Sequence, residues 1–325
     1  MVDCLSAGLG LGPSPSGTGP QPAETISRPG GHGNADKMKP PKFRYHAPSS
    51  LDEALDLLAT YGDDAVVLSG GQSLIPMLNL RLARPAEVVD IARIDGLGYV
   101  EAGECSVSVG ALVTHRKMET DPEVARLLPM AREAAGLIGF RAIRNRGTVG
   151  GSVAHADPSA EWPAVLLALD GSVEMRSSSG ARQVDASDFF KSVFTTARRP
   201  DEIVSSVRFG SRFAGNWGFS EFQRRTGDFA VVVAAVACAE SSDRSGETRV
   251  ALAGVADRPV RCAEAEAALA DASDPRAAAE AARDAFDPAG DAHGSTAYRK
   301  QLVYAQVLRA ATQALTRRGG GRPDG

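Results

Sequence analysis

The chain has 325 residues, of which 43% are hydrophobic and 23% charged, and its formal net charge is −4. These values are ordinary for a globular protein, and the length is sufficient for two domains with separate cores. The slightly acidic balance gives no electrostatic support for a nucleic-acid partner, and no apolar run approaches the roughly 18–20 residues that a transmembrane helix needs.

Residues 1–37 form a segment rich in Gly, Pro, Ser and Thr, with almost no bulky apolar side chains. Such a segment cannot bury enough surface to offset the entropy of ordering, so we expect it to be disordered. It lacks the basic start and the continuous apolar stretch of a secretory signal peptide, and Met38 is an alternative start codon. We therefore expect a cytoplasmic location.

Ordered structure is expected to begin with a small α/β unit at about residues 38–93. A capping box formed by Ser50 and Glu53 starts a helix with one apolar face. The short buried strand Ala65–Leu68 runs directly into a stretch with two adjacent glycines, which is followed by a helix and by a strand at Glu87–Ile91. This alternation of strands and helices is typical of a compact α/β unit.

Two further regions follow, at about 94–213 and 216–317. In the first we expect a strand at 106–110, one helix over 122–138, a second stretch with two adjacent glycines, a helix from Asp157-Pro158 to Leu169, and three more strands. In the second, three strand-like segments precede three Ala-rich helices, and a Gly-rich tail at 318–325 is expected to be flexible. The pattern predicts an α+β protein.

The two glycine stretches, SGGQS at 69–73 and TVGGS at 148–152, each lie near an expected helix start. Glycine permits positive φ and leaves the main-chain N–H groups open to a ligand. Helix starts attract anions because their first amides are unpaired and the helix dipole is positive there. A single stretch of this kind is more often a tight turn, but two in matched contexts predict one extended, negatively charged ligand held from both sides.

Residue types that carry catalysis form no recognisable set in this sequence. There is no P-loop lysine motif, no GxGxxG after a strand and no GxSxG elbow, so we assign no catalytic residue. The four cysteines are far apart without a CxxC pair, and the pair His155 and Asp157 lacks a third ligand, so no metal site is expected. A bound cofactor that brings its own chemistry fits such a chain.

Three stretches carry a family resemblance: SGGQSLIPMLNLRLARPAEVVDI at 69–91, RNRGTVGGSVAHADPSAEWPAVLLAL at 144–169 and FQRRTGDFA at 222–230. In this order they resemble the FAD-binding medium subunits of the molybdenum hydroxylases, which include relatives of xanthine dehydrogenase, aerobic carbon monoxide dehydrogenase and nicotine dehydrogenase. The resemblance covers roughly 39–316. It implies a two-part FAD-binding domain of the PCMH type at 38–213, with subdomains at about 38–93 and 94–213. A C-terminal domain with a three-stranded sheet and helices would follow at 216–317.

The resemblance also implies which residues contact the flavin. The backbones of the two glycine stretches would hold the pyrophosphate and ribityl portions of FAD; their residues are Ser69, Gly70, Gly71, Gln72, Ser73, Thr148, Val149, Gly150, Gly151 and Ser152. Thr114, Asp157 and Glu161 match polar positions near the flavin, and Phe229 matches an aromatic that covers the isoalloxazine ring in some relatives. The alternatives are helix capping for Asp157 and a core position for Phe229. Gln72 replaces a His that is frequent in the family, which leaves binding through peptide N–H groups intact.

By the same resemblance, the chain would be an electron-transfer subunit that itself holds only FAD. A large partner subunit would carry the molybdenum cofactor and hydroxylate the substrate, and a small partner subunit would carry two [2Fe–2S] clusters. FAD would pass the electrons to an external acceptor, and a dimer of such heterotrimers is expected. Two alternatives are a free-standing flavin oxidoreductase of the wider FAD-fold superfamily and a small-nucleotide binding module.

Deleting residues 1–37 is expected to leave the FAD content and the melting temperature nearly unchanged, because the composition of this segment supports no core. The measurement is flavin absorbance and thermal unfolding of the shortened chain beside the full chain. A fall of several degrees in the melting temperature of the shortened chain would show that the segment packs.

Overall fold

The structure is a computed structural model that describes residues 39–213, 215–239, 247–292 and 294–319. The N-terminal segment 1–37, predicted to be disordered, lies outside these residues, as does most of the predicted tail at 318–325. The last helix, α12 (Thr296–Gly319), includes the first two residues of that tail. In the described part of the chain, none of the helices has the length and apolarity that crossing a membrane requires.

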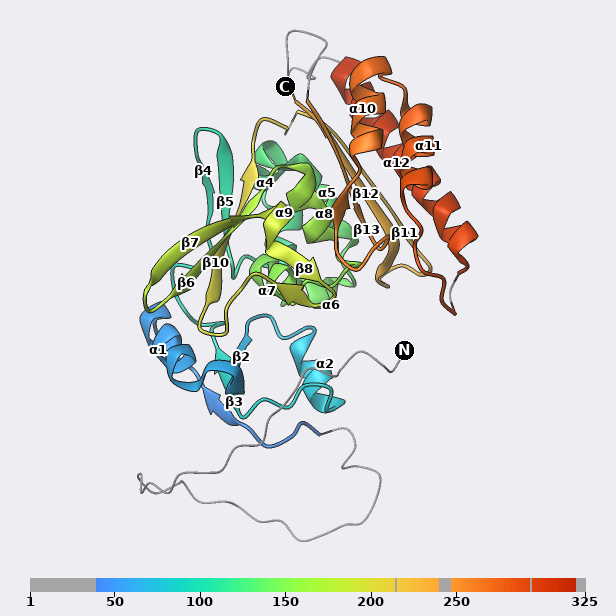
Figure 1. The fold of residues 1–325 in the computed structure, drawn as a ribbon. Coiled ribbons are helices and arrows are strands. Elements are labelled where there is room, and N and C mark those ends of the chain that lie inside the picture. The colour runs from blue at the N-terminus through green and yellow to red at the C-terminus, as the bar shows by residue number, and fades with distance from the viewer. Residues whose placement is uncertain (1–38, 214, 240–246, 293, 320–325) are drawn as a thin grey trace, which may run out of the picture. The chain divides into compact units, whose positions relative to one another are not determined.

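A three-stranded parallel sheet with the order β1-β3-β2 forms the first unit, drawn in blue and cyan in Figure 1. Ser50 caps α1 by accepting a hydrogen bond from the amide of Glu53 at 3.2 Å, as the capping box predicts. The apolar side of α1 packs in a small core with Val89 and Ile91. The elements are β1 (Arg44–His46), α1 (Leu51–Tyr61), a 3-10 turn (Gly62–Asp64), β2 (Ala65–Leu68), α2 (Leu74–Asn79) and β3 (Glu87–Asp90).

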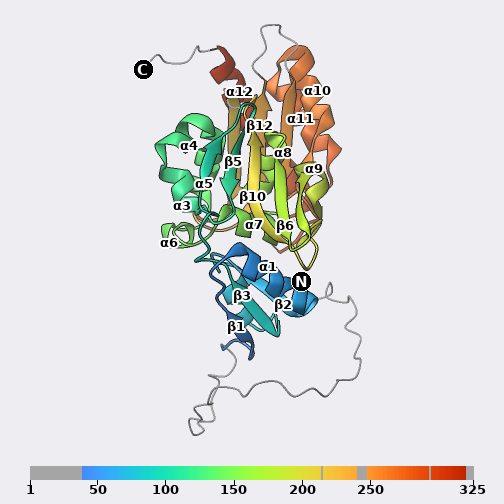
Figure 2. The same ribbon diagram turned by 90° about the vertical axis from the view of Figure 1, so that its left-hand side faces the viewer.

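A five-stranded antiparallel sheet with the order β4-β5-β10-β6-β7 forms the second unit, and Figure 2 shows β5, β10 and β6 side by side in it. The strands are β4 (Val100–Ala102), β5 (Ser106–Gly110), β6 (Ser172–Ser177), β7 (Gly180–Asp185) and β10 (Ile203–Gly210), with a small hairpin of β8 (Phe190–Ser192) and β9 (Thr195–Thr196). The helices are α3 (His115–Thr120), α4 (Pro122–Leu127), α5 (Pro129–Leu137), α6 (Arg141–Arg144), α7 (Val149–His155), α8 (Glu161–Ala168) and α9 (Ala186–Phe189).

Helix α8 is buried on all sides. None of its residues is exposed, from Glu161 to Ala168. Its Trp162 lies against Phe209 of β10, with 6.2 Å between the ring centroids, while the helix also contacts strands β12 (Ala230–Cys238) and β13 (Thr248–Ala253). A helix that is covered all round needs no polar stripe, which explains the apolar sequence after Glu161.

The C-terminal sheet has four antiparallel strands in the order β11-β12-β13-β14, where three strands were predicted. Its edge strands are β11 (Asn216–Gln223) and the short β14 (Val260–Arg261). Side chains of β12 alternate between two cores: Val233 and Ala235 pack in the core that contains α8, whereas Val232 and Ala234 pack beneath α10 (Ala263–Ala272), α11 (Pro275–Ala285) and α12. Both faces of β12 are therefore covered, which explains its unbroken apolar run (Figure 1).

Three predicted local features differ from the structure. The single helix expected over 122–138 is divided into α4 and α5, because Pro129 disfavours a helical conformation of the residue before it and Leu128 adopts φ −135° and ψ 59°. The helix expected from Asp157 begins at Glu161 instead, and the Oδ1 atom of Asp157 accepts from the amide of Ser159 at 2.8 Å within a turn. The second pair of glycines is the first turn of α7 rather than a loop.

Candidate cofactor site

A cavity of about 420 Å³ is lined by residues of both sheet units and of the turn before β12. Most of the residues predicted to contact a cofactor line this cavity, although they come from distant parts of the sequence. They are Ser69, Gly70, Gly71, Gln72, Ser73, Thr148, Gly150, Gly151, Ser152, Asp157, Glu161 and Phe229. The structure thus brings the two glycine stretches to one site.

Two of the predicted contact residues do not line the cavity. The side chain of Thr114 caps α3 by accepting from the amide of Lys117 at 3.1 Å. The side chain of Val149 is fully buried in the core. Their roles as cofactor contacts stay predictions.

The first glycine stretch presents unpaired backbone amides at the cavity. Gly71 has a φ of +74°, which an L-residue adopts only with strain. Among the described residues, no atom accepts a hydrogen bond from the amides of Gly70, Gly71 or Gln72. Three successive unpaired N–H groups just before the start of α2 form a site that suits an anion.

The second glycine stretch contributes in a different way, because its amides already have partners within the chain. The amide of Val149 donates to Val113 at 2.9 Å, that of Gly150 to Ala111 at 3.0 Å, and that of Gly151 to the Thr148 side chain at 3.0 Å. A Cβ atom at Gly150 would overlap the backbone of Ala111. Glycine at 150 therefore permits close packing of α7 rather than a positive φ.

The two stretches touch each other directly. The hydroxyl groups of Ser69 and Thr148 are 2.8 Å apart and share a hydrogen bond. A Cβ atom at Gly70 would overlap the carbonyl group of Arg146, so no side chain fits there. This approach fixes the unpaired amides of the first stretch beside the start of α7.

Carboxyl groups gather where α8 begins. Glu161 is only 4% exposed and forms no ion pair within the described chain. Burial raises its pKa, and the nearby charges of Glu221 and Asp157 raise it further. Burial also raises the pKa of Glu221 on β11, whose Oε1 accepts from Gln223 at 2.5 Å and whose Oε2 has no partner among the described residues. Burial therefore favours the protonated form of both carboxyl groups, of which Glu161 lines the cavity.

Phe229 lies beside the cavity with 61% of its surface exposed. The alternative of a core position is therefore wrong. Next to it, Gly227 has a φ of +88°, and a Cβ atom there would lie 2.7 Å from the ring of Phe140. The turn before β12 places an exposed aromatic ring beside the cavity, and the role of Phe229 as a flavin contact stays a prediction.

His115 is a cavity residue that the sequence analysis did not identify. Its Nδ1 accepts a hydrogen bond from the indole N–H of Trp162 at 3.0 Å. Because an indole N–H can only donate, the proton of the neutral imidazole is on Nε2. Burial, together with the charge of Arg144, lowers the pKa of His115 to about 4. His115 is therefore a neutral hydrogen-bond donor. No local sequence pattern indicates this role, because it depends on the contact with Trp162, which lies 47 residues away in the sequence.

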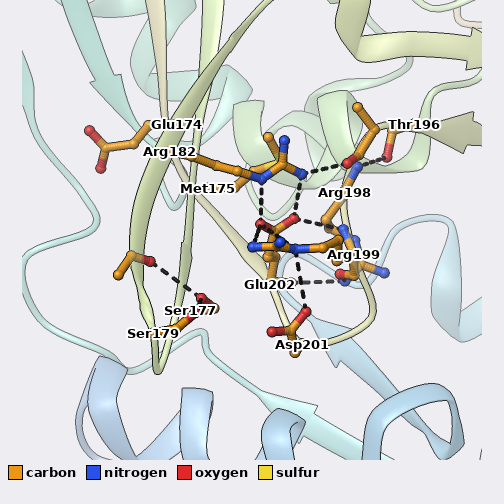
Figure 3. A network of polar contacts seen from close by, with 12 residues as sticks. Glu174, Met175, Ser177, Ser179, Arg182, Thr196, Arg198, Arg199, Asp201 and Glu202 are labelled. Carbon is orange, nitrogen blue, oxygen red and sulfur yellow. Dashed lines mark hydrogen bonds and ion pairs between the residues drawn. The ribbon is translucent and has the colours of Figure 1, made fainter.

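A second group that the sequence analysis missed surrounds Glu202 (Figure 3). This buried carboxylate accepts from Nε and Nη2 of Arg182 at 2.6 and 2.8 Å, and from the amide and Nε of Arg199 at 2.7 and 3.1 Å. Burial opposes its ionisation, but the two arginines outweigh this and lower its pKa. Arg198 lies in the same turn, and both Arg198 and Glu202 line the cavity.

Comparisons with known families match almost the whole described chain. Residues 41–210 match the family described as the FAD-binding domain in molybdopterin dehydrogenase. Residues 217–314 match the CO dehydrogenase flavoprotein C-terminal domain.

Individual proteins are similar over most of their length. The 6-hydroxypseudooxynicotine dehydrogenase complex subunit alpha of Paenarthrobacter nicotinovorans is 40% identical over 286 residues, which are 86% of this chain and 97% of that protein. A solved structure of carbon monoxide dehydrogenase from Hydrogenophaga pseudoflava matches with a TM-score of 0.82 and 36% identity, covering 86% of this chain and 99% of the matched chain. Quinoline 2-oxidoreductase from Pseudomonas putida 86 matches with a TM-score of 0.80 and 37% identity, covering 87% and 99%.

Replacing Gly71 by Val is expected to lower flavin affinity at least about tenfold, because a positive φ costs a non-glycine residue roughly 1–2 kcal/mol and the loop would relax away from the anion-binding geometry. Gly150→Val would also lower the flavin content, because its side chain would push α7 away from Ala111. The measurement is flavin stoichiometry of purified protein, with circular dichroism as a check on folding. Gly98→Val is the matched control, since a Cβ at this exposed glycine meets no atom within 4 Å. Normal flavin stoichiometry in both site variants would contradict the assignment.

Glu161→Gln is expected to stabilise the FAD-free protein at alkaline pH. The folded state raises the pKa of Glu161, so the wild type loses stability as the pH rises from the unfolded value toward the folded one. Glutamine has no proton to lose, so its melting temperature should exceed that of the wild type by at least about 2 °C at pH 9, with the difference disappearing near pH 5. Glu104→Gln, at an exposed position, is the control. A difference that does not change with pH would show that Glu161 is not a buried protonated carboxyl.

Proposed function

The chain belongs to the family of FAD-binding medium subunits of the molybdenum hydroxylases, and we propose that it carries electrons from iron–sulfur clusters of a partner subunit through FAD to an external acceptor. It is an oxidoreductase subunit with FAD as its cofactor. The observation that carries the proposal is the cavity shared by both glycine stretches, with the unpaired amides of Gly70, Gly71 and Gln72 at its wall.

The residues of this cavity fit a dinucleotide with a diphosphate. Unpaired amides and the positive φ of Gly71 suit an anion that approaches the backbone closely. The cavity volume of about 420 Å³ lies within the range of small-molecule sites, and its lining includes many apolar side chains. An aromatic side chain at Phe229 supplies a surface for a flat ring.

FAD supplies the electron chemistry when it is bound, and the residues of this chain control binding and protons. The amides of Gly70, Gly71 and Gln72 would hold the diphosphate. His115 could donate from Nε2 without adding a positive charge, because burial and the hydrogen bond from Trp162 to Nδ1 keep it neutral. Burial favours the protonated form of Glu161, which lines the cavity, so its carboxyl group could supply a proton there.

We assign the iron–sulfur clusters to a small partner subunit and the molybdenum cofactor to a large one, in a dimer of heterotrimers. The names of relatives support membership of a multi-subunit complex, because they include a dehydrogenase complex subunit and a carbon monoxide dehydrogenase medium chain. We place the domain boundaries at 38–213 and 216–317, in line with the family matches at 41–210 and 217–314. The proposed location of the complex is the cytoplasm.

Co-expression with its partners is expected to recover this chain with a Cys-rich iron–sulfur subunit and a molybdenum subunit. Expressed alone, the chain should bind FAD and show only slow transfer of electrons to artificial acceptors, because electrons must reach its flavin from another protein. The measurement is hydroxylation of an N-heterocycle, an aldehyde or carbon monoxide by the isolated chain and by the reconstituted complex. If the isolated, FAD-loaded chain oxidised such a substrate at the rate of the complex, the subunit assignment would fail.

A further inference from the structure

A hairpin tip with two exposed apolar side chains lies next to one end of the cavity. Val193 and Phe194 connect β8 to β9, and they are 47% and 55% exposed. Phe194 has a φ of +52°, a conformation that a bulky L-residue adopts only with strain. Strained residues of this kind are concentrated at ligand-binding sites, where the surrounding structure holds them in place.

Contacts with the end of α7 hold Phe194 in this conformation. Its amide donates to the carbonyl of Ala156 at 3.3 Å, and its ring lies beside the imidazole of His155 with 4.9 Å between the centroids. His155 in turn lines the cavity. The Phe194 ring is thus supported by a cavity residue on one side, while the residue as a whole stays exposed.

The exposed Phe229 borders the same end of the cavity. In the turn after α7, the carbonyl of Pro158 accepts a hydrogen bond from the amide of Gly254 at 2.8 Å. A Cβ atom at Gly254 would overlap the carbonyl of Val231, so the strand that follows Phe229 lies directly against this connection. The hairpin tip and Phe229 therefore both border the segment at 155–158, and both place apolar surface there.

The ionisable side chains at this end of the cavity are mostly carboxyl groups. In the lining segments at 154–161 and 227–229 they are Asp157, Glu161 and Asp228, together with His155. Burial lowers the pKa of His155, although Asp157 opposes this, so the neutral imidazole is favoured. The cationic residues of neighbouring segments are exposed and do not line the cavity; they are Arg141, Lys191, Arg224, Arg225 and Arg258.

One arginine, Arg198, does line the cavity, and acidic residues already act on it. Its Nη1 donates to the carbonyl groups of Arg199 and Glu202, each at 2.8 Å. Burial lowers the pKa of Arg198, while the charges of Glu202, Asp201 and Asp63 oppose this. These acidic neighbours offset its charge, so Arg198 does not make the cavity attractive to a negatively charged acceptor.

Backbone amides at this end of the cavity have acceptors within the chain. Those of Gly227 and Asp228 donate within their own turn, each at 3.1 Å. Those of Ser159 and Ala160 both donate to Asp157, at 2.8 and 3.1 Å. The amides of these four residues are therefore not available to the diphosphate of a nicotinamide dinucleotide.

We propose that the external acceptor is an uncharged quinone, whose ring enters beside Phe194 and Phe229 to meet the flavin. The inference rests on the proposed function, because it assumes that FAD presents its flavin ring at this end of the cavity. Exposed aromatic side chains provide stacking surface for an apolar ring, and the carboxyl groups do not repel a neutral one. Two electrons and one proton leave the reduced flavin (FADH⁻), a second proton comes from solvent, and the quinone becomes a hydroquinone while FAD is restored.

The first test compares two anthraquinones that share one ring system. 2-(Hydroxymethyl)anthraquinone is uncharged, whereas anthraquinone-2-sulfonate carries a negative charge. Equilibrium dialysis against the FAD-loaded full-length chain should show that the uncharged compound binds at least about fivefold more tightly, and that NAD⁺ binds more weakly than either. Equal or tighter binding of the sulfonate, or tighter binding of NAD⁺, would overturn the proposal.

The second test removes the stacking surface. Phe194→Ser should weaken binding of the uncharged anthraquinone about fivefold and slow reoxidation of the reduced flavin by duroquinone to a similar degree. Reoxidation by ferricyanide, which needs no stacking, should stay within about twofold, as should both acceptors with Phe194→Tyr, which keeps the ring. Leu80→Ser is the matched control, because Leu80 is also exposed but does not line the cavity.

Unchanged quinone binding in Phe194→Ser would overturn the proposal, as would equal slowing of duroquinone and ferricyanide. If Phe194→Ser does not fold, the comparison of the two anthraquinones in the wild type still decides. A wild-type chain that binds no FAD, or whose reduced flavin reacts with none of these acceptors, would instead contradict the proposed function and the inference with it.

Discussion

The close approach of two backbone segments, at residues 69–71 and 146–148, determines the geometry of the cavity. At Gly70 the main chain lies so near the carbonyl group of Arg146 that no Cβ atom fits, and the hydroxyls of Ser69 and Thr148 are hydrogen-bonded at 2.8 Å. The first segment follows β2 and the second leads into α7, so this contact joins the parallel sheet to the helices of the second unit. The unpaired amides then face a cavity whose opposite walls belong to different parts of the chain.

The ionisable side chains in those walls differ in their protonation, because they differ in burial and in the partners that packing gives them. Glu161 is buried at the start of α8, which is covered by two sheets, and this burial, together with the charges of Glu221 and Asp157, raises its pKa. His115 is kept neutral by burial and by the hydrogen bond from Trp162. The turn at Arg198 and Glu202 keeps its ionised groups because Arg182 and Arg199 compensate the buried carboxylate. The cavity therefore combines a buried carboxyl group on α8 with a cluster of paired charges at the turn before β10.

The parts of this site that are local in sequence were predictable. The two glycine stretches, the capping box at Ser50 and the strands at 65–68 and 106–110 follow from residue patterns, and the family resemblance was confirmed by the matches to both domains. Sequence patterns failed where a single long-range contact decides the outcome. The pairing of His115 with Trp162, and that of Arg182 with Glu202, joins residues that no spacing rule connects. The break at Leu128 was missed although Pro129 is a local signal, because the apolar pattern continues through it.

A structure of the chain with bound FAD is the most direct test of the claim that the two glycine stretches hold one dinucleotide. The diphosphate is expected within hydrogen-bonding distance, about 2.7–3.2 Å, of the backbone amides of Gly70, Gly71 and Gln72, beside the start of α7. Flavin density at another surface, or a diphosphate that contacts none of these amides, would contradict the account.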